Sequence, residues 1–203
     1  LLQSDTWPTI VRRTLNKQFG SRVKLKFETS VATRENTRGA LERLQRDIFF
    51  AEPNILTVKY GTNDSTYLMS NRGAPLVSQD AFRFNLLELV DKCRLFNIRR
   101  LIFITNHLVA LDRYDINGLT TDENTQFYDE IIREVASTSA CHLADVRKAM
   151  ENYKPKELCL DDQIHVNKFG AKVYAEIIAP VIAMVLEGLI DFENQQLQVS
   201  AKC

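Results

Sequence analysis

The stretch Ile55-Leu56-Thr57-Val58-Lys59-Tyr60-Gly61-Thr62-Asn63-Asp64 decides the fold of this chain. Its first four residues form a short β-rich run that is typical of a buried parallel strand. Gly61 and the residues after it are turn formers, so the strand is expected to end in a sharp polar turn. A second stretch, Asp161-Asp162-Gln163-Ile164-His165-Val166-Asn167, places a carboxylate three residues before a histidine. The two stretches are expected to meet in space.

Short β-rich runs alternate with amphipathic segments on both sides of this strand. Strands are predicted at 23–27, where apolar and basic residues alternate, and at 55–58, 101–104 and 140–144. This alternation predicts a parallel sheet with helices on both faces, joined by right-handed crossovers. The expected fold class is α/β, a flavodoxin-like three-layer α/β/α domain. In such sheets ligands bind at the carboxyl ends of the strands.

Local signals set the ends of the predicted helices. The first helix is expected to begin at Trp7-Pro8 and to end at Gly20. Thr37 and Thr121 are the predicted N-caps of two further helices, and a short helix is expected over 145–153.

The last helix is expected to run from Lys168 to about Glu187, with Asn167 as its N-cap and a kink at Pro180. Residues 1–190 are expected to form a single domain. Residues 191–203 are expected to form a polar, frayed C-terminal tail.

The composition argues against several classes of protein. The chain has 203 residues, with 26 Lys+Arg and 26 Asp+Glu, so its zero net charge favours no nucleic-acid or anionic-membrane partner. No uninterrupted apolar run approaches the roughly 20 residues that span a bilayer, so no transmembrane segment is predicted. No signal-peptide pattern appears. No two of the four cysteines are close enough in sequence to suggest a zinc site, and Cys93 and Cys141 lie in apolar segments. Buried thiols in a reducing compartment are therefore favoured over a disulfide framework, which predicts a cytoplasmic protein.

His165 and Asp162 are the candidate acid–base pair. A histidine titrates near neutral pH, so it can take a proton from a nucleophile and return it to a leaving group. A carboxylate at the other ring nitrogen holds such a base in one tautomer, and Asp162 lies within one turn of His165. Asp161 is the local competitor for this role. The same spacing alone fits equally well a turn cap beside a surface histidine.

Asn63 is the candidate oxyanion donor. An amide on a tight turn can stabilise the negative charge that develops on a tetrahedral intermediate. Gly61 lets the backbone turn sharply, although Gly, Asn and Asp also mark ordinary strand-ending turns. Asn106 and His107 follow the predicted strand at 101–104, so they are expected at the same rim as candidate substrate-binding residues.

Taken together, these motifs resemble the SGNH (GDSL) hydrolase family. Gly-x-Asn-Asp follows a buried strand, and Asp-x-x-His precedes the C-terminal helix. Trp7-Pro8 resembles the family's early helix start, and Glu35-Asn36-Thr37-Arg38 its second block. The resemblance covers most of residues 7–187.

The resemblance implies an esterase or acylhydrolase that cleaves a small-molecule carboxylic ester, an acetyl ester of a sugar or an acyl ester of a lipid. It implies that His165 is the general base, that Asp162 orients it, and that Asn63 donates to the oxyanion. No metal or organic cofactor is implied. Family members form an acyl-enzyme through the serine of a Gly-Asp-Ser motif after the first strand.

The chain departs from the family pattern in two places. It has no Gly-Asp-Ser; by the family's spacing that serine is expected upstream of Leu1, and Ser4 lacks the preceding strand. An upstream segment is therefore expected, because without the first strand those at 23–27 and 55–58 lack a shared neighbour. Arg34 occupies the position of a glycine whose backbone N–H joins the oxyanion hole. These departures leave a non-catalytic binding protein as the alternative. A nucleotide-binding flavodoxin-like domain is a second alternative, but no Gly-rich phosphate loop follows any predicted strand of this chain.

Overall fold

The computed structural model describes residues 6–200, with side chains through residue 195. Within them, the sheet has three strands, β1 (Ile55–Val58), β2 (Arg100–Ile104) and β3 (His142–Ala144), in the order β1-β2-β3. Both pairings are parallel, with Ile55 opposite Arg100 and Ile102 opposite His142. The prediction of a parallel α/β fold is confirmed.

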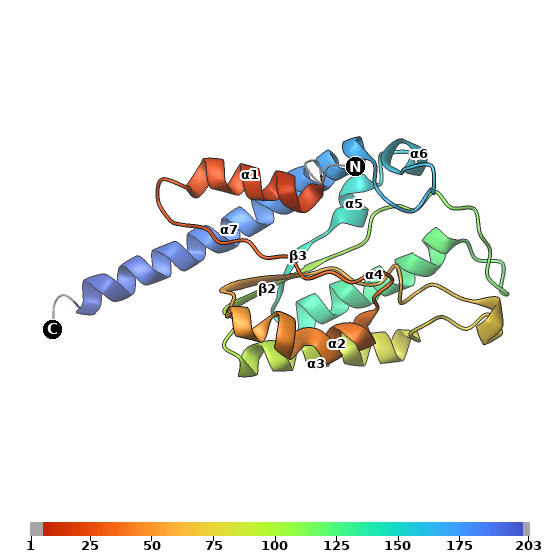
Figure 1. Ribbon diagram of the computed structural model, residues 1–203, viewed down its shortest axis with the longest axis horizontal. Helices are drawn as coiled ribbons and strands as arrows, with labels where there is room; N and C mark the ends of the chain where they lie inside the picture. Colours follow the sequence, from red (N-terminus) through yellow and green to blue (C-terminus); the bar gives the residue numbers. More distant parts are fainter. Residues whose placement is uncertain (1–5, 201–203) are drawn as a thin grey trace.

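Helices cover both faces of this sheet (Figure 1). One face carries α1 (Trp7–Phe19), α5 (Val146–Met150), α6 (Pro155–Leu158) and the long α7 (Lys168–Ser200). The other face carries α2 (Thr37–Asp47), α3 (Gln79–Leu95) and α4 (Thr121–Thr138). Single 3-10 turns lie at Phe49–Ala51 and Met69–Asn71.

β2 lies at the centre of both apolar cores because its side chains alternate between the two faces. Leu101 and Phe103 pack with α3 and α4, whereas Ile102 and Ile104 pack with α1 and α7. Phe103, Ile102 and Ile104 are fully buried. The carboxyl end of β2 therefore delivers the next residues to a fixed place between the two helical layers.

The prediction of a strand at 23–27 is wrong. Val23, Leu25 and Phe27 do alternate inward against the apolar core, while Lys24 and Lys26 are exposed. A strand also needs a neighbour to accept its backbone hydrogen bonds, and among residues 6–200 this segment has none. Its side-chain period is that of a strand, but its backbone is only extended.

Two predicted N-caps are displaced by one residue. Asn36, not Thr37, caps α2, because its side chain accepts hydrogen bonds from the Arg38 and Gly39 N–H groups. Thr120, not Thr121, caps α4, and Glu123 completes a capping box with it. Asn167 caps α7 as expected, its side chain accepting from Gly170 N at 2.9 Å.

The last helix is longer than predicted. It continues through Pro180 and past Glu187 to Ser200, so residues 191–200 are helical rather than a frayed tail. Glu193 forms an ion pair with Arg99 at 2.7 Å, which ties this part of the helix to the start of β2. Residues 201–203 lie outside the described residues.

α7 also qualifies the prediction of no transmembrane segment. Within the described residues it is the one helix long and apolar enough to cross a membrane by length and composition, over Lys168–Gln195. Half of its most apolar window is buried against the rest of the protein.

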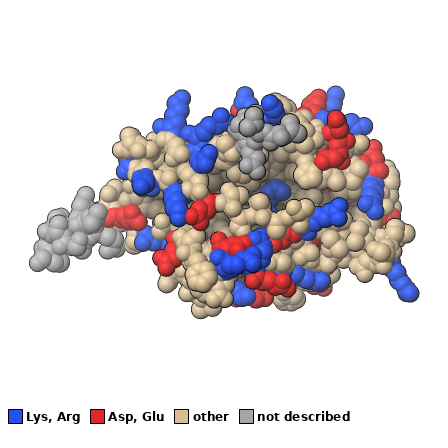
Figure 2. Space-filling model, viewed as in Figure 1, with Lys and Arg blue, Asp and Glu red and all other residues tan. Residues whose placement is uncertain are grey.

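The remaining surface and the cysteines are unexceptional. Basic and acidic side chains are interspersed over the face shown in Figure 2. Cys93, Cys141 and Cys159 are free thiols, two of them buried, whereas Cys203 lies outside the described residues.

Candidate active site

His165 and Asp162 form a hydrogen-bonded pair in the loop before α7. Nδ1 of His165 lies 2.6 Å from the Asp162 carboxylate, and the imidazole is 76% exposed. Among the described residues, the second ring nitrogen, Nε2, has no partner. The pair therefore has the arrangement of a general base and its orienting carboxylate, with the free nitrogen left for a reacting group.

The backbone of this loop fixes Asp162 in place. Its carboxylate accepts the N–H groups of Ile164 and His165, both at 2.9 Å. Gln163 takes a left-handed conformation (φ 63°), which turns the chain back so that both N–H groups converge. These backbone hydrogen bonds, more than the imidazole, lower the pKa of Asp162 to about 2. Asp161, the competing carboxylate, is exposed and makes no such contact.

Asp64 fixes the turn that follows β1. Its buried carboxylate accepts the Gly61 N–H at 3.1 Å across the turn. It also accepts the backbone N–H and the hydroxyl of Thr37, at 2.9 and 2.6 Å. Burial raises the pKa of Asp64, and these hydrogen bonds oppose that rise. One side chain thereby joins the turn to the start of α2.

This junction brings together the two predicted oxyanion-hole residues. Asn63 Nδ2 donates to the backbone oxygen of Glu35 at 2.8 Å, directly beside Arg34. Arg34 has a φ of 56°, the left-handed conformation that favours glycine, and its side chain is exposed. Within residues 6–200 its backbone N–H has no acceptor, and neither has the second amide hydrogen of Asn63. Two donors are therefore available at one place.

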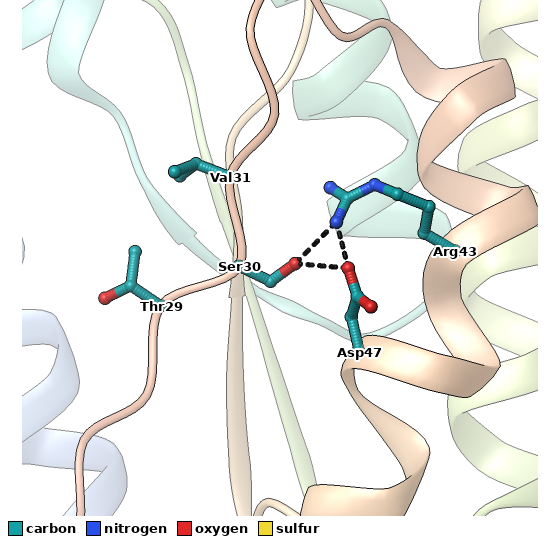
Figure 3. A pocket seen from close by; sticks show the side chains of 5 residues that line it. All are labelled: Thr29, Ser30, Val31, Arg43 and Asp47. Atoms are coloured by element: carbon teal, nitrogen blue, oxygen red, sulfur yellow. Dashed lines mark hydrogen bonds and ion pairs between the residues drawn. The ribbon is translucent and has the colours of Figure 1, made fainter.

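Glu35 is a part of this site that sequence reasoning missed. Its carboxylate forms a bidentate pair with Arg43 of α2 and accepts the Tyr60 hydroxyl at 3.0 Å. Arg43 also contacts Ser30 and Asp47, beside a hollow of about 350 Å³ (Figure 3). The Arg43 hydrogen bonds lower the pKa of Glu35. The sequence identified residues 35–38 as resembling the family's second block, but it did not show that Arg43 and Tyr60 hold the Glu35 side chain in place.

Asn106 and His107 lie after β2 as predicted, but they do not face solvent. Asn106 is fully buried, and its amide donates to Asp129 at 2.8 Å and to Tyr60 O at 3.1 Å. His107 is 6% exposed and lies between Tyr174 and Ile164. This burial gives no support to the prediction that they contact a substrate.

Comparison with known proteins identifies the family. The family model described as "GDSL-like Lipase/Acylhydrolase family" matches residues 2–173. The chain belongs to this family. In this GDSL-like chain, the Asp-x-x-His motif is held together by the Asp162–His165 hydrogen bond. The turn that carries Asn63 is held together by the hydrogen bond from Gly61 N to Asp64.

Solved structures at low sequence identity share the fold of this GDSL-like chain. An α/β-hydrolase enzyme from the metagenome of Lake Arreo has a TM-score of 0.73 and 22% identity, over 87% of this chain and 81% of that one. An acetylxylan esterase of Geobacillus stearothermophilus has a TM-score of 0.74 and 15% identity, over 87% and 80%. Among curated proteins, the "Uncharacterized lipoprotein YqeF" of Bacillus subtilis is 26% identical over 124 residues, 55% of this chain. The match spans half of that relative's length.

Among residues 6–200, no serine is hydrogen-bonded to His165, whose side chain pairs with Asp162. Ser4 lies in the part of the chain that the structure does not describe. Within the described residues, no cluster of three His, Cys, Asp or Glu side chains could hold a metal ion.

Proposed function

We propose that this GDSL-like protein hydrolyses carboxylic esters through a serine nucleophile. His165 is the general base, Asp162 orients it, and Asn63 with the Arg34 N–H binds the oxyanion. The observation that carries the proposal is the His165–Asp162 hydrogen bond of 2.6 Å, which leaves Nε2 exposed and unpartnered among residues 6–200.

The proposed reaction has two steps. The serine oxygen attacks the acyl carbonyl while Nε2 of His165 takes its proton, and the same proton then goes to the departing alcohol. Water attacks the acyl-enzyme with His165 again as base, which releases the acid. Asp162, ionised above pH 4, stabilises the imidazolium that forms in each step.

Acetyl esters are the first substrates to test. Two of the structural relatives are named acetylxylan esterases, that is, enzymes that act on an acetylated sugar, and so provide the first comparison. A longer acyl ester of a lipid is the other class, in keeping with the lipases of the family. Parallel assays with p-nitrophenyl acetate and p-nitrophenyl octanoate separate the two.

The test of the mechanism compares His165→Ala with His142→Gln. His165→Ala is expected to abolish ester hydrolysis and leave the melting temperature unchanged, because its side chain is 76% exposed. His142 lies in β3 away from the loop, so its variant should retain activity. Hydrolysis that survives in His165→Ala would remove this residue from the mechanism.

The oxyanion assignment has its own test. Asn63→Ala is expected to lower kcat by about 10²–10³-fold, with a much smaller change in KM, because the donor acts on charge that develops in the transition state. Steady-state kinetics on the preferred ester measures both constants. A change in KM alone would contradict the assignment.

A binding protein on the same fold is the second candidate. Arg34 favours it, since an exposed arginine stands where the family has a glycine, at the mouth of the predicted oxyanion hole. The cellular location of the protein also stays a prediction. The Bacillus relative is named a lipoprotein, so fractionation should test a membrane-attached location beside the cytoplasmic one.

A further inference from the structure

Asn106 and His107 are consecutive residues that contact the two separate halves of the candidate site. The Asn106 side chain forms two hydrogen bonds with the turn after β1. Its Oδ1 accepts the Thr62 hydroxyl at 2.8 Å, and its Nδ2 donates to Tyr60 O at 3.1 Å. Tyr60 and Thr62 lie on either side of Gly61, and Thr62 immediately precedes Asn63.

His107 contacts the other half. Its Nε2 lies 2.6 Å from the backbone oxygen of Ile164, the residue immediately before His165. A carbonyl oxygen only accepts, so the proton of the imidazole is on Nε2. Nδ1 then accepts the Tyr174 hydroxyl at 3.1 Å.

The surroundings keep His107 in this neutral tautomer. Burial, and then the positive charge of Lys59, lower its pKa to about 4. The hydrogen bond to Ile164 O opposes this shift, Arg147 adds to it, and Asp122 opposes it. Burial raises the pKa of Tyr174, which therefore remains a donor. Near neutral pH, His107 is a fixed donor aimed at the loop of the general base.

The pair is itself held firmly. The backbone N–H of Asn106 and its amide both donate to the buried Asp129, at 2.7 and 2.8 Å. Asp129 pairs with Arg147, which also makes a bidentate contact with Asp122. A second hydrogen bond, from Ala110 N to Gln163 O at 2.9 Å, also joins the loop after β2 to the loop of His165.

We propose that Asn106-His107 is a positioning pair, in which His107 fixes the loop of His165 relative to the turn of Asn63 by donating to Ile164 O. The geometric part of this inference stands without catalysis. Its kinetic consequence rests on the proposed function. His107 touches no reacting atom, and acts through the loop that it holds.

The wild-type protein provides the first test. The chain contains three histidines, so His142→Gln and His165→Ala assign all ring signals in a long-range ¹H–¹⁵N NMR spectrum. At pH 7, His107 is expected as the Nε2–H tautomer, with a slowly exchanging ring proton. An Nδ1–H tautomer would overturn the proposal, because the ring would then have no donor for Ile164 O.

Two substitutions then separate positioning from packing. His107→Gln retains an N–H donor at nearly the same reach, whereas His107→Leu fills the volume without a donor. His107→Leu is expected to raise the measured pKa of Asp162 from about 2 towards its ordinary 3.8, because the Ile164 and His165 N–H groups no longer converge on it. His107→Gln should retain the low value.

Kinetics completes the experiment. A misplacement of about 1 Å costs on the order of 10²-fold, so kcat of His107→Leu should fall by up to that factor with KM little changed, and His107→Gln should restore most of it. A shifted Asp162 pKa in a protein without esterase activity would support the positioning role and contradict only the proposed function. An unshifted Asp162 pKa in folded His107→Leu, or equal kcat in both variants, would overturn the positioning role.

Discussion

Asp162 is the residue whose charge state the structure specifies most closely. The Ile164 and His165 N–H groups bind its ionised form, and its pKa is lowered to about 2 from the usual 3.8. A carboxylate with a lowered folded-state pKa contributes stability above its unfolded pKa and loses it as the pH falls through the folded one.

The loop of His165 is therefore expected to keep its structure down to about pH 4 and to open between about pH 4 and pH 2. The amide shifts of Ile164 and His165 in an NMR pH titration follow this opening. A transition centred above pH 4 would show that these N–H groups do not bind the carboxylate.

The Asp162–His165 contact was predictable because it is local. Three residues separate the two side chains, so one turn of backbone brings them together without help from the fold. The burial of Asn106 and His107 was not predictable in the same way. Their covering partners, Asp129 of α4 and Tyr174 of α7, come from distant parts of the chain.

Gly61 is required at the end of β1 for two reasons. Its φ of 125° is a conformation that L side chains rarely adopt. A Cβ there would also lie 2.5 Å from the Asn106 amide nitrogen, which is held in place by Asp129.

Gly61→Ala is accordingly expected to lower the free energy of unfolding by about 1–3 kcal/mol. Gly188→Ala is the matched control, because Gly188 is helical and has no atom within 4 Å of an added Cβ. That variant should gain about 0.4–1 kcal/mol. Urea denaturation measures both, and an equal response would contradict the close approach of Asn106.

At the scale of a single element, segment 23–27 has the side-chain pattern of a strand but does not form one. Alternating side chains satisfy the burial requirement of a strand, and that part of the prediction was right. Hydrogen bonding requires a neighbour, and the sequence of the segment holds no information about whether one is present. β1 has correspondingly one paired edge in the described structure, and three of its four residues are only half-buried.

At the scale of the molecule, the Arg147 side chain ties α5 to α4, and its backbone N–H donates to the Thr105 hydroxyl, just after β2, at 3.0 Å. It is 5% exposed, and it pairs with the fully buried Asp129 as well as with Asp122. Neither partner lies near it in the sequence, so this ion pair was not predicted. Removing one partner of a buried pair leaves an uncompensated charge.

Arg147→Met is expected to cost about 3–5 kcal/mol of stability and to disturb the site through Asn106. Arg22→Met is the control, because the Arg22–Glu187 pair is largely exposed and its loss should leave the melting temperature nearly unchanged. Thermal unfolding of the two variants compares them. A small effect of Arg147→Met would mean that Asp129 is neutral in the folded protein.

The overall architecture was predictable because the strands and helices alternate in a regular order. That the two motif stretches come together was expected from the sequence. The contacts that join them were not predictable, since Asn106 and His107 take their partners from two helices, α4 and α7, and from two loops. The family match adds the expectation of a serine nucleophile, and no serine among residues 6–200 is hydrogen-bonded to His165.

The most direct measurement is covalent labelling of the full-length gene product with a fluorophosphonate, followed by mapping of the modified peptide by mass spectrometry. The account predicts one labelled serine, with labelling lost in His165→Ala and retained in His142→Gln. If no serine reacts in the folded protein, the account of a serine hydrolase is contradicted and the binding protein takes its place.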